Sequence, residues 1–179
     1  NDGKIVVAGT TNPESGGGFS FANSDFCMAR YNPDGTLDST FGSGRKLKSN
    51  FAVGTACEEA ILQKDGKIIL VGFAWNNANQ DDFALARYNA NGSLDATFGN
   101  GGLTLTDFGD SSYKSDHVYA AALQEDGRIV AAGGTFASQN SALARYNANG
   151  TLDTSFGTGG KVITDLDEVD SAIDVAIYG

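Results

Sequence analysis

The chain has few of the residues on which most enzymes and metal sites depend. It contains one histidine, His117, and two cysteines, Cys27 and Cys57, among 179 residues. A zinc site needs clustered histidines and cysteines, and nucleophilic catalysis needs a nucleophile, a base and an orienting group. We therefore expect no metal site, no cofactor and no catalytic site. The two cysteines each lie in an apolar run, which favours buried thiols over a disulfide.

Proline, positive charge and long apolar stretches are also scarce. The chain has 2 prolines and a formal net charge of −10. Such an acidic chain repels a phosphate backbone, and no stretch approaches the roughly 18 apolar residues of a membrane span. We expect neither nucleic-acid binding nor membrane insertion. Glycine is abundant, at 24 residues, and 41% of the chain is apolar, which favours short strands joined by tight turns around a real core.

Two phrases occur three times along the chain. "ARYNPDGTLDSTFGSG" at 29–44 returns as "ARYNANGSLDATFGNG" at 86–101 and "ARYNANGTLDTSFGTG" at 144–159. Each copy follows a shorter phrase: "NDGKIVVAG", "KDGKIILVG" or "EDGRIVAAG". The chain is thus three copies of a unit of about sixty residues.

The chain begins and ends within this unit. "AILQKD" at 60–65 corresponds to "AALQED" at 121–126, and the third counterpart is "AIYG" at 176–179 followed by "ND" at 1–2. We therefore expect the last strand, residues 172–178, to complete the unit begun at 1–9, in the same ring or in that of a neighbouring chain.

Each unit has the pattern of a β-sheet. Runs of five to eight residues rich in Val, Ile, Phe and Tyr are bounded by Gly, Asn and Asp, and no run has a helical period. In the second unit this predicts four strands, at 57–63, 67–74, 82–89 and 103–108.

The repeated phrase "RYNxxGxLD" predicts a hairpin with a fixed register. Asn32, Pro33, Asp34 and Gly35 suit a type I turn closed by a left-handed glycine. That turn places an arginine opposite an aspartate in every unit. The expected structural ion pairs are Arg30–Asp38, Arg87–Asp95 and Arg145–Asp153, each contributing roughly 0.2–1 kcal/mol.

The pattern "DGKIvvaG … dFalARYNxdGsLDxtFGxGG" resembles the delta-60 repeat (DUF5122-type) of β-propellers, and more distantly NHL-type blades. The resemblance covers essentially all of residues 1–179, which we take as one repeat domain. It implies one four-stranded blade per unit and a secreted or cell-surface bacterial protein, and it implies no activity. Because propellers carry about four to eight blades, three blades need completion. We expect a six-bladed ring from two chains, a homodimer, or further repeats of a longer chain.

Candidate ligand residues lie in two places. Trp75 begins the polar loop "WNNANQDD", in which Trp75, Asn76, Asn77 and Asp81 could stack on and hydrogen-bond a sugar; the alternative is that Trp75 covers the rim of a blade. Glu58 and Asp174 share one column of the repeat and could ring an axial channel and hold a cation or water.

Calcium binding is a further alternative. The turn "NPDGTLD" at 32–38 offers oxygen ligands, although turn chemistry already explains its Asn, Asp and Gly. The acidic stretch 164–174 is typical of a solvated loop rather than an ion site.

Three functions remain open at this stage. The sequence favours a non-enzymatic scaffold or binding module that contacts another protein through its loop face. A carbohydrate-binding, lectin-like oligomeric propeller is the second interpretation, and a polysaccharide-acting enzyme the third.

Overall fold

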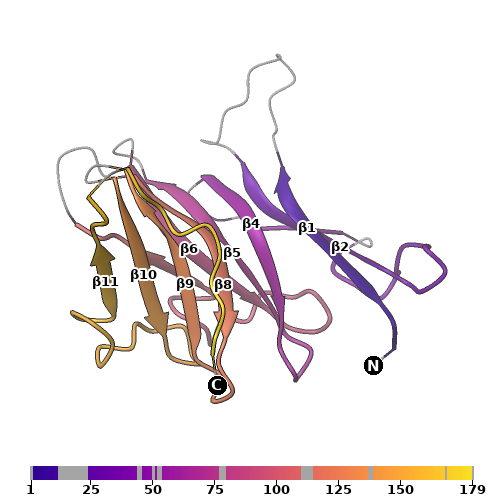
Figure 1. Cartoon of the computed structure of the whole chain (residues 1–179). Helices are drawn as coiled ribbons and strands as arrows, with labels where there is room; N and C mark the ends of the chain where they lie inside the picture. Colours follow the sequence, from indigo (N-terminus) through magenta and orange to yellow (C-terminus); the bar gives the residue numbers. More distant parts are fainter. Residues whose placement is uncertain are drawn as a thin grey trace, which may run out of the picture.

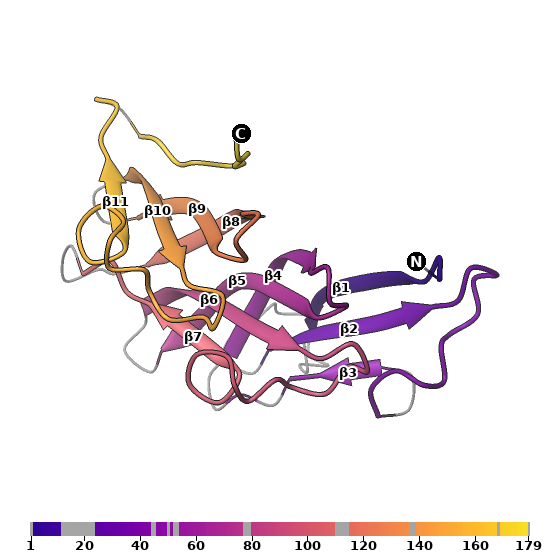
Figure 2. The ribbon, with the colours of Figure 1, turned by 90° about the horizontal axis from the view of Figure 1, so that it is seen from below.

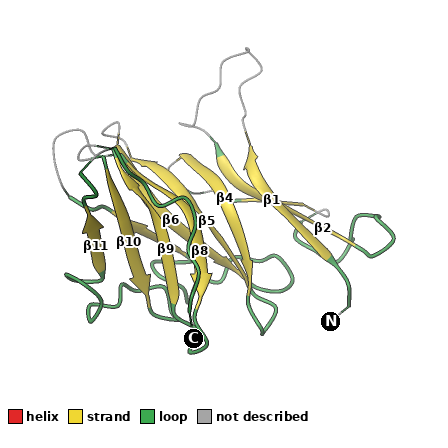
Figure 3. Ribbon diagram, viewed as in Figure 1, coloured by secondary structure: helices red, strands yellow, loops and turns green. Residues whose placement is uncertain are grey.

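The computed structural model is built only of strands, turns and irregular segments. It describes residues 2–11, 24–43, 46–49, 51, 54–76, 80–109, 115–136, 139–167 and 169–178. Within these ranges no helix is long and apolar enough to cross a membrane. The expected all-β class is confirmed (Figure 3).

In these described residues, eleven strands form three antiparallel sheets that follow one another along the chain (Figure 1). The sheets have the orders β1-β2-β3, β4-β5-β6-β7 and β11-β10-β9-β8. The strands are β1 (Ile5–Thr11), β2 (Asp25–Tyr31), β3 (Lys46–Lys48), β4 (Gly54–Leu62), β5 (Ile68–Asn76), β6 (Gln80–Tyr88), β7 (Leu103–Thr106), β8 (Asp116–Leu123), β9 (Ile129–Thr135), β10 (Asn140–Tyr146) and β11 (Lys161–Thr164).

The family resemblance implied a four-stranded blade in every unit, with residues 172–178 as the inner strand of the first, and the described part of the first sheet departs from this. The first sheet has three strands, because nothing described there takes the inner position that β4 and β8 occupy in the other two sheets. The second and third sheets have the four strands expected of propeller blades.

The sheets stack face to face, so the middle sheet is buried on both sides (Figure 2). On one face, Ile69 and Val71 of β5 join the core shared with the third sheet. On the other face, Ile68 and Leu70 join the core shared with the first sheet. Side chains of a strand alternate between its faces, which explains why β5 is the nearly continuous apolar run "IILVGFA".

The inner strands β4 and β8 pack on their neighbouring strands in the same way. Each has a β-bulge, at Glu58 in β4 and at Tyr119 in β8, where the register shifts by one residue. Next to the bulge, the backbone carbonyl of the inner strand lies over a glycine, Gly72 in β5 or Gly133 in β9. A Cβ at these glycines would lie 1.8 Å from the Ala56 oxygen and 1.9 Å from the His117 oxygen.

The three "RYNxxGxLD" hairpins have the predicted register. In the first, Asn32 N–H donates to the Thr36 carbonyl and Asp38 N–H to the Arg30 carbonyl. Each arginine Nε lies 2.8 Å from the opposing carboxylate, in the pairs Arg30–Asp38, Arg87–Asp95 and Arg145–Asp153.

Each of these arginines also has contacts that turn chemistry does not predict. Its guanidinium carbon lies 4.6 Å from the centre of a phenylalanine ring, in the pairs Arg30–Phe41, Arg87–Phe98 and Arg145–Phe156. Two of the arginines also donate to a carbonyl of the following unit: Arg30 to Ala90 and Arg87 to Ala148. In the first and second units the repeated arginine therefore ties its own hairpin to the next blade.

Residues 170–178 form no sheet of their own and lie beside the third blade. Asp170 N–H donates to the Gln139 carbonyl, and Ala172 N–H donates to the Gly133 carbonyl of β9 over 3.0 Å. Figures 1 and 2 show this segment away from β1. Completion of the first unit by the chain's own residues 172–178 therefore does not occur in this structure. Completion by another chain stays a prediction.

The paired aspartates predict a loss of stability in acid. Hydrogen bonds from Lys4 and Thr40 hold the pKa of Asp38 well below its usual value, and one from Thr97 does the same for the pKa of Asp95. A carboxyl whose pKa is lower in the folded state stabilises that state above its unfolded pKa and loses this effect as the pH falls. We expect the free energy of unfolding to be flat from pH 7 to about 5 and to fall below about pH 4. Urea titrations at these pH values measure it; stability that rises toward pH 3 would contradict the assignment.

Candidate ligand site at the loop end of the second and third blades

The residues that the sequence singled out in the loop of the second unit lie at one end of the sheets. We call this the loop end; it is where β5 passes to β6 and β9 passes to β10, opposite the turns at 63–67 and 124–128. Trp75 and Asp81 are direct cross-strand partners in the β5–β6 ladder. Direct partners share a face of the sheet, so the two predicted ligand residues are brought together.

Asp81 binds a residue from the third blade that the sequence reading had set aside. The His117 Nε2 of β8 lies 2.8 Å from the Asp81 Oδ2, and both side chains are largely buried. The other oxygen, Oδ1, is buried without a hydrogen-bond partner among the described residues. The pair joins the second and third blades at the loop end.

Aromatic rings enclose His117. The Phe73 ring stacks on the imidazole at 4.0 Å between centroids, with the two planes 6° apart. The Phe136 ring meets the imidazole edge-on at 4.6 Å, and Phe136 is 54% exposed. We call Phe73, Trp75, Asp81, His117 and Phe136 the loop-end cluster. In this cluster the exposed Phe136 ring lies over the largely buried His117–Asp81 pair.

The loop-end cluster has the chemistry of a binding surface. Aromatic rings supply large apolar contact area with little side-chain entropy to lose, and a buried histidine–carboxylate pair fixes their position.

The remaining predicted ligand residues are placed only in part. The backbone of Asn76 ends β5, while its side chain and all of Asn77 lie outside the described residues. The acid Glu58 is exposed at the bulge of β4, and its charge contributes, after burial, to the raised pKa of Tyr119 on β8. Asp174 is exposed in the segment 170–178.

Two groups of acidic residues offer oxygen atoms that could bind a cation. In the turn at 32–38, the Asp34 carboxylate accepts hydrogen bonds from Thr36, and Asp38 is engaged by Arg30 and Lys4. A group missed by the sequence reading lies between the second and third blades, where carboxylate oxygens of Asp82, Asp107 and Asp116 lie within 4.8 Å of one another. Oxygen donors at this spacing suit a hard cation.

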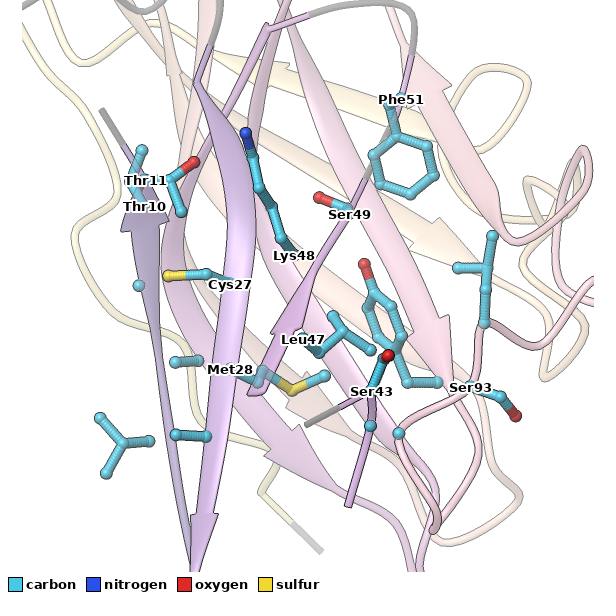
Figure 4. Close-up of a pocket in the computed structure, with 18 of the residues that line it drawn as sticks. Thr10, Thr11, Cys27, Met28, Ser43, Leu47, Lys48, Ser49, Phe51 and Ser93 are labelled. Carbon is cyan, nitrogen blue, oxygen red and sulfur yellow. The ribbon is translucent and has the colours of Figure 1, made fainter. Parts of the chain in front are cut away.

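A cavity of about 1190 Å³ opens along the first blade (Figure 4). Its walls come from β1, β2, the strand β3 and the turn at 91–94 of the second unit, and Met28, Leu47 and Phe51 give it apolar surface. Cys27 also lines it.

Cys27 and Cys57 are free thiols, but both are half-buried rather than buried as the sequence predicted. Burial, then the neighbouring Cys27, raises the pKa of Cys57 to about 12.

The fold defines the class of protein. Stacked four-stranded antiparallel sheets, each a meander with its first strand innermost, are the blades of a β-propeller. A family model described as "Domain of unknown function (DUF5122) beta-propeller" matches residues 1–41, 63–98 and 124–156. The chain belongs to this family, which confirms the resemblance read from the repeats. A search of curated proteins found no match.

Proposed function

We propose that the chain is a non-enzymatic binding module of a secreted or cell-surface bacterial protein, and that it contacts a protein partner through the loop end. The observation that carries the proposal is the loop-end cluster, in which Phe136 stands exposed over the His117–Asp81 pair. At protein interfaces, a few aromatic side chains that are supported by well-packed, buried neighbours contribute most of the binding free energy. The location rests on the family resemblance of the repeats.

Selection of peptides displayed on phage against the purified chain tests this proposal. Enriched peptides should bind with a saturable dissociation constant that rises at least tenfold in Phe136→Ala. Leu62→Ala is the matched control, because Leu62 is 63% exposed beside the turn at the opposite end of the blade. Peptides that bind Phe136→Ala as well as the unmodified chain, or no enriched peptide at all, would contradict the proposal.

A carbohydrate ligand is the second candidate, favoured by the position of Trp75 directly across from Asp81. An indole beside a carboxylate can stack on a sugar ring while the oxygens bind its hydroxyl groups. A glycan array separates the two functions: saturable glycan binding that is lost in Trp75→Ala would replace the protein partner with a carbohydrate.

A further inference from the structure

The first blade carries a glycine whose counterparts are each covered by an inner strand. Gly72 and Gly133 lie under the carbonyls of Ala56 and His117 at the bulges of β4 and β8. Their counterpart in β1 is Gly9, which precedes Thr10 as Gly72 precedes Phe73. Among the described residues, no atom lies within 4 Å of the Cβ position at Gly9.

The inner edge of β1 and the outward face of its sheet are both open in the described structure, since β1 pairs only with β2. Ile5, on that outward face, is 54% exposed, whereas its counterpart Ile68 is 2% exposed in the core that the second sheet shares with the first. Val7 is 51% exposed, whereas its counterpart Leu70 is fully buried. An apolar, unpaired strand edge is a template for another strand.

Residues 171–178 have the sequence of an inner strand and no sheet to join. Ala172, Ile173 and Asp174 occupy the repeat positions of Ala56, Cys57 and the bulge residue Glu58. This segment lies against the third blade, as β8 lies against β5 and β6 of the second blade. It thus has the position of an inner strand of a further blade stacked on the third. Ile173 is 78% exposed and Tyr178 fully exposed.

A second, independent mismatch lies at the hairpin turns. A Cβ at Gly92 would lie 3.1 Å from the Phe41 ring and a Cβ at Gly150 would lie 2.7 Å from the Phe98 ring, so each glycine makes room for a phenylalanine of the preceding blade; both rings are fully buried. The corresponding phenylalanine of the third blade, Phe156, is only partly buried. The corresponding glycine of the first blade, Gly35, has no described atom within 4 Å of its Cβ position.

The arginines show the same asymmetry. Arg30 donates to the Ala90 carbonyl and Arg87 to the Ala148 carbonyl. Arg145 makes no such bond within the described ranges, and the residue at the repeat position of Ala90 and Ala148 in the first unit is Pro33. The third blade therefore has three features without a described partner: the segment 171–178, the Phe156 ring and the Arg145 guanidinium. The first blade has the matching sites: the open edge of β1, the space at Gly35 and the Pro33 carbonyl.

We propose that the third blade of one chain docks on the first blade of a second copy, and that the contact is repeated about a twofold axis to close a six-bladed ring. In each of the two contacts, residues 171–178 form the inner strand of the partner's first blade. By analogy with the β4–β5 ladder, Asp174 is the bulge and the paired residues are Ile173 with Gly9, Val175 with Ala8, Ala176 with Val7, Ile177 with Val6 and Tyr178 with Ile5.

Phe156 packs on Gly35 of the partner subunit, and Arg145 donates to the carbonyl of Pro33 of the partner subunit. A twofold axis repeats the same contact twice and pairs both open edges at once. The assembly does not depend on the ligand proposed for the loop end, because none of these residues belongs to the loop-end cluster.

Molar mass in solution, measured by light scattering, tests the proposal. The unmodified chain should have twice its mass of 18.6 kDa. Gly9→Val should halve that value while retaining the β-sheet circular dichroism, because the space at Gly9 is open within a single chain. A monomeric unmodified chain, or a Gly9→Val variant that is still a dimer, would overturn the proposal.

Oxidative cross-linking tests the register without relying on a disruptive substitution. The double variant Val7→Cys with Ala176→Cys places the two thiols directly opposite each other and should give a covalent dimer on a non-reducing gel. Val6→Cys with Ala176→Cys is the matched control, since positions 6 and 7 face opposite sides of the strand. An intramolecular disulfide in a species of monomer mass would show that the chain fills its own first blade, and equal cross-linking of the two variants would refute the register.

Discussion

Gly72→Ala is expected to lower the free energy of unfolding by about 3 kcal/mol or more, the upper part of the range for an overpacked core. The new Cβ would lie 1.8 Å from the Ala56 oxygen, and the other atoms nearest to it also belong to backbone. No flexible side chain can move aside, so β4 must leave its bulge or the middle blade must shift. Domains are stable by only about 5–15 kcal/mol in total, and the change removes a large part of that.

Urea unfolding followed by the fluorescence of Trp75, the only tryptophan, measures this loss. Gly9→Ala is the matched control, because the same change at the same repeat position meets no described atom within 4 Å. Both variants are compared at a chain concentration low enough for monomers, where Gly9→Ala should differ from the unmodified chain by less than about 0.5 kcal/mol. Equal losses in the two variants would show that Gly72 is not pressed by an inner strand.

Arg87→Met is expected to cost about 3 kcal/mol, the magnitude found when one partner of a buried ion pair is removed. The Arg87 side chain is 9% exposed, its Nε lies 2.8 Å from Asp95 Oδ2, and its Nη1 donates to the Ala148 carbonyl over 2.6 Å. The substitution leaves the Asp95 carboxylate with Lys67 and Thr97 as its described partners, and it removes one of the bonds that join the second blade to the third.

Arg145→Met is the control for this prediction, because Arg145 is paired with Asp153 and lies over Phe156 but reaches no carbonyl of another blade in the described structure. Its side chain is also more exposed, so the expected cost in the monomer is about 1 kcal/mol. The difference between the two variants measures the contact between blades. Equal costs would show that the repeated arginine stabilises only its own hairpin.

The local structure of each blade could be predicted from the sequence because its causes are local. The phrase "RYNxxGxLD" contains both strands and the turn of one hairpin, so turn chemistry alone fixes which residues face each other. The predicted strand at 82–89 differs from β6 only in its ends. The bulges at Glu58 and Tyr119 were not predicted, because they depend on a close approach between strands rather than on a turn residue.

The loop-end cluster could be predicted only in part, because its residues come from different blades. Trp75 and Asp81 lie on adjacent strands of one hairpin, which the sequence places together. His117 is 36 residues from Asp81 in sequence, and their contact depends on how two blades stack. The sequence did contain one indication of this contact. His117 stands where the other units have Ala56 and Ala172, and Asp81 stands where they have the uncharged Ser24 and Gln139. Two such substitutions in neighbouring units are what a contact between their side chains would produce.

Amide hydrogen exchange of β1 and of residues 172–178 tests the claim that two three-bladed chains complete each other. In a closed ring both segments form one ladder, and their amides should be protected as strongly as those of β4 and β5. Fast exchange in both segments, under conditions where β4 and β5 remain protected, would contradict the claim.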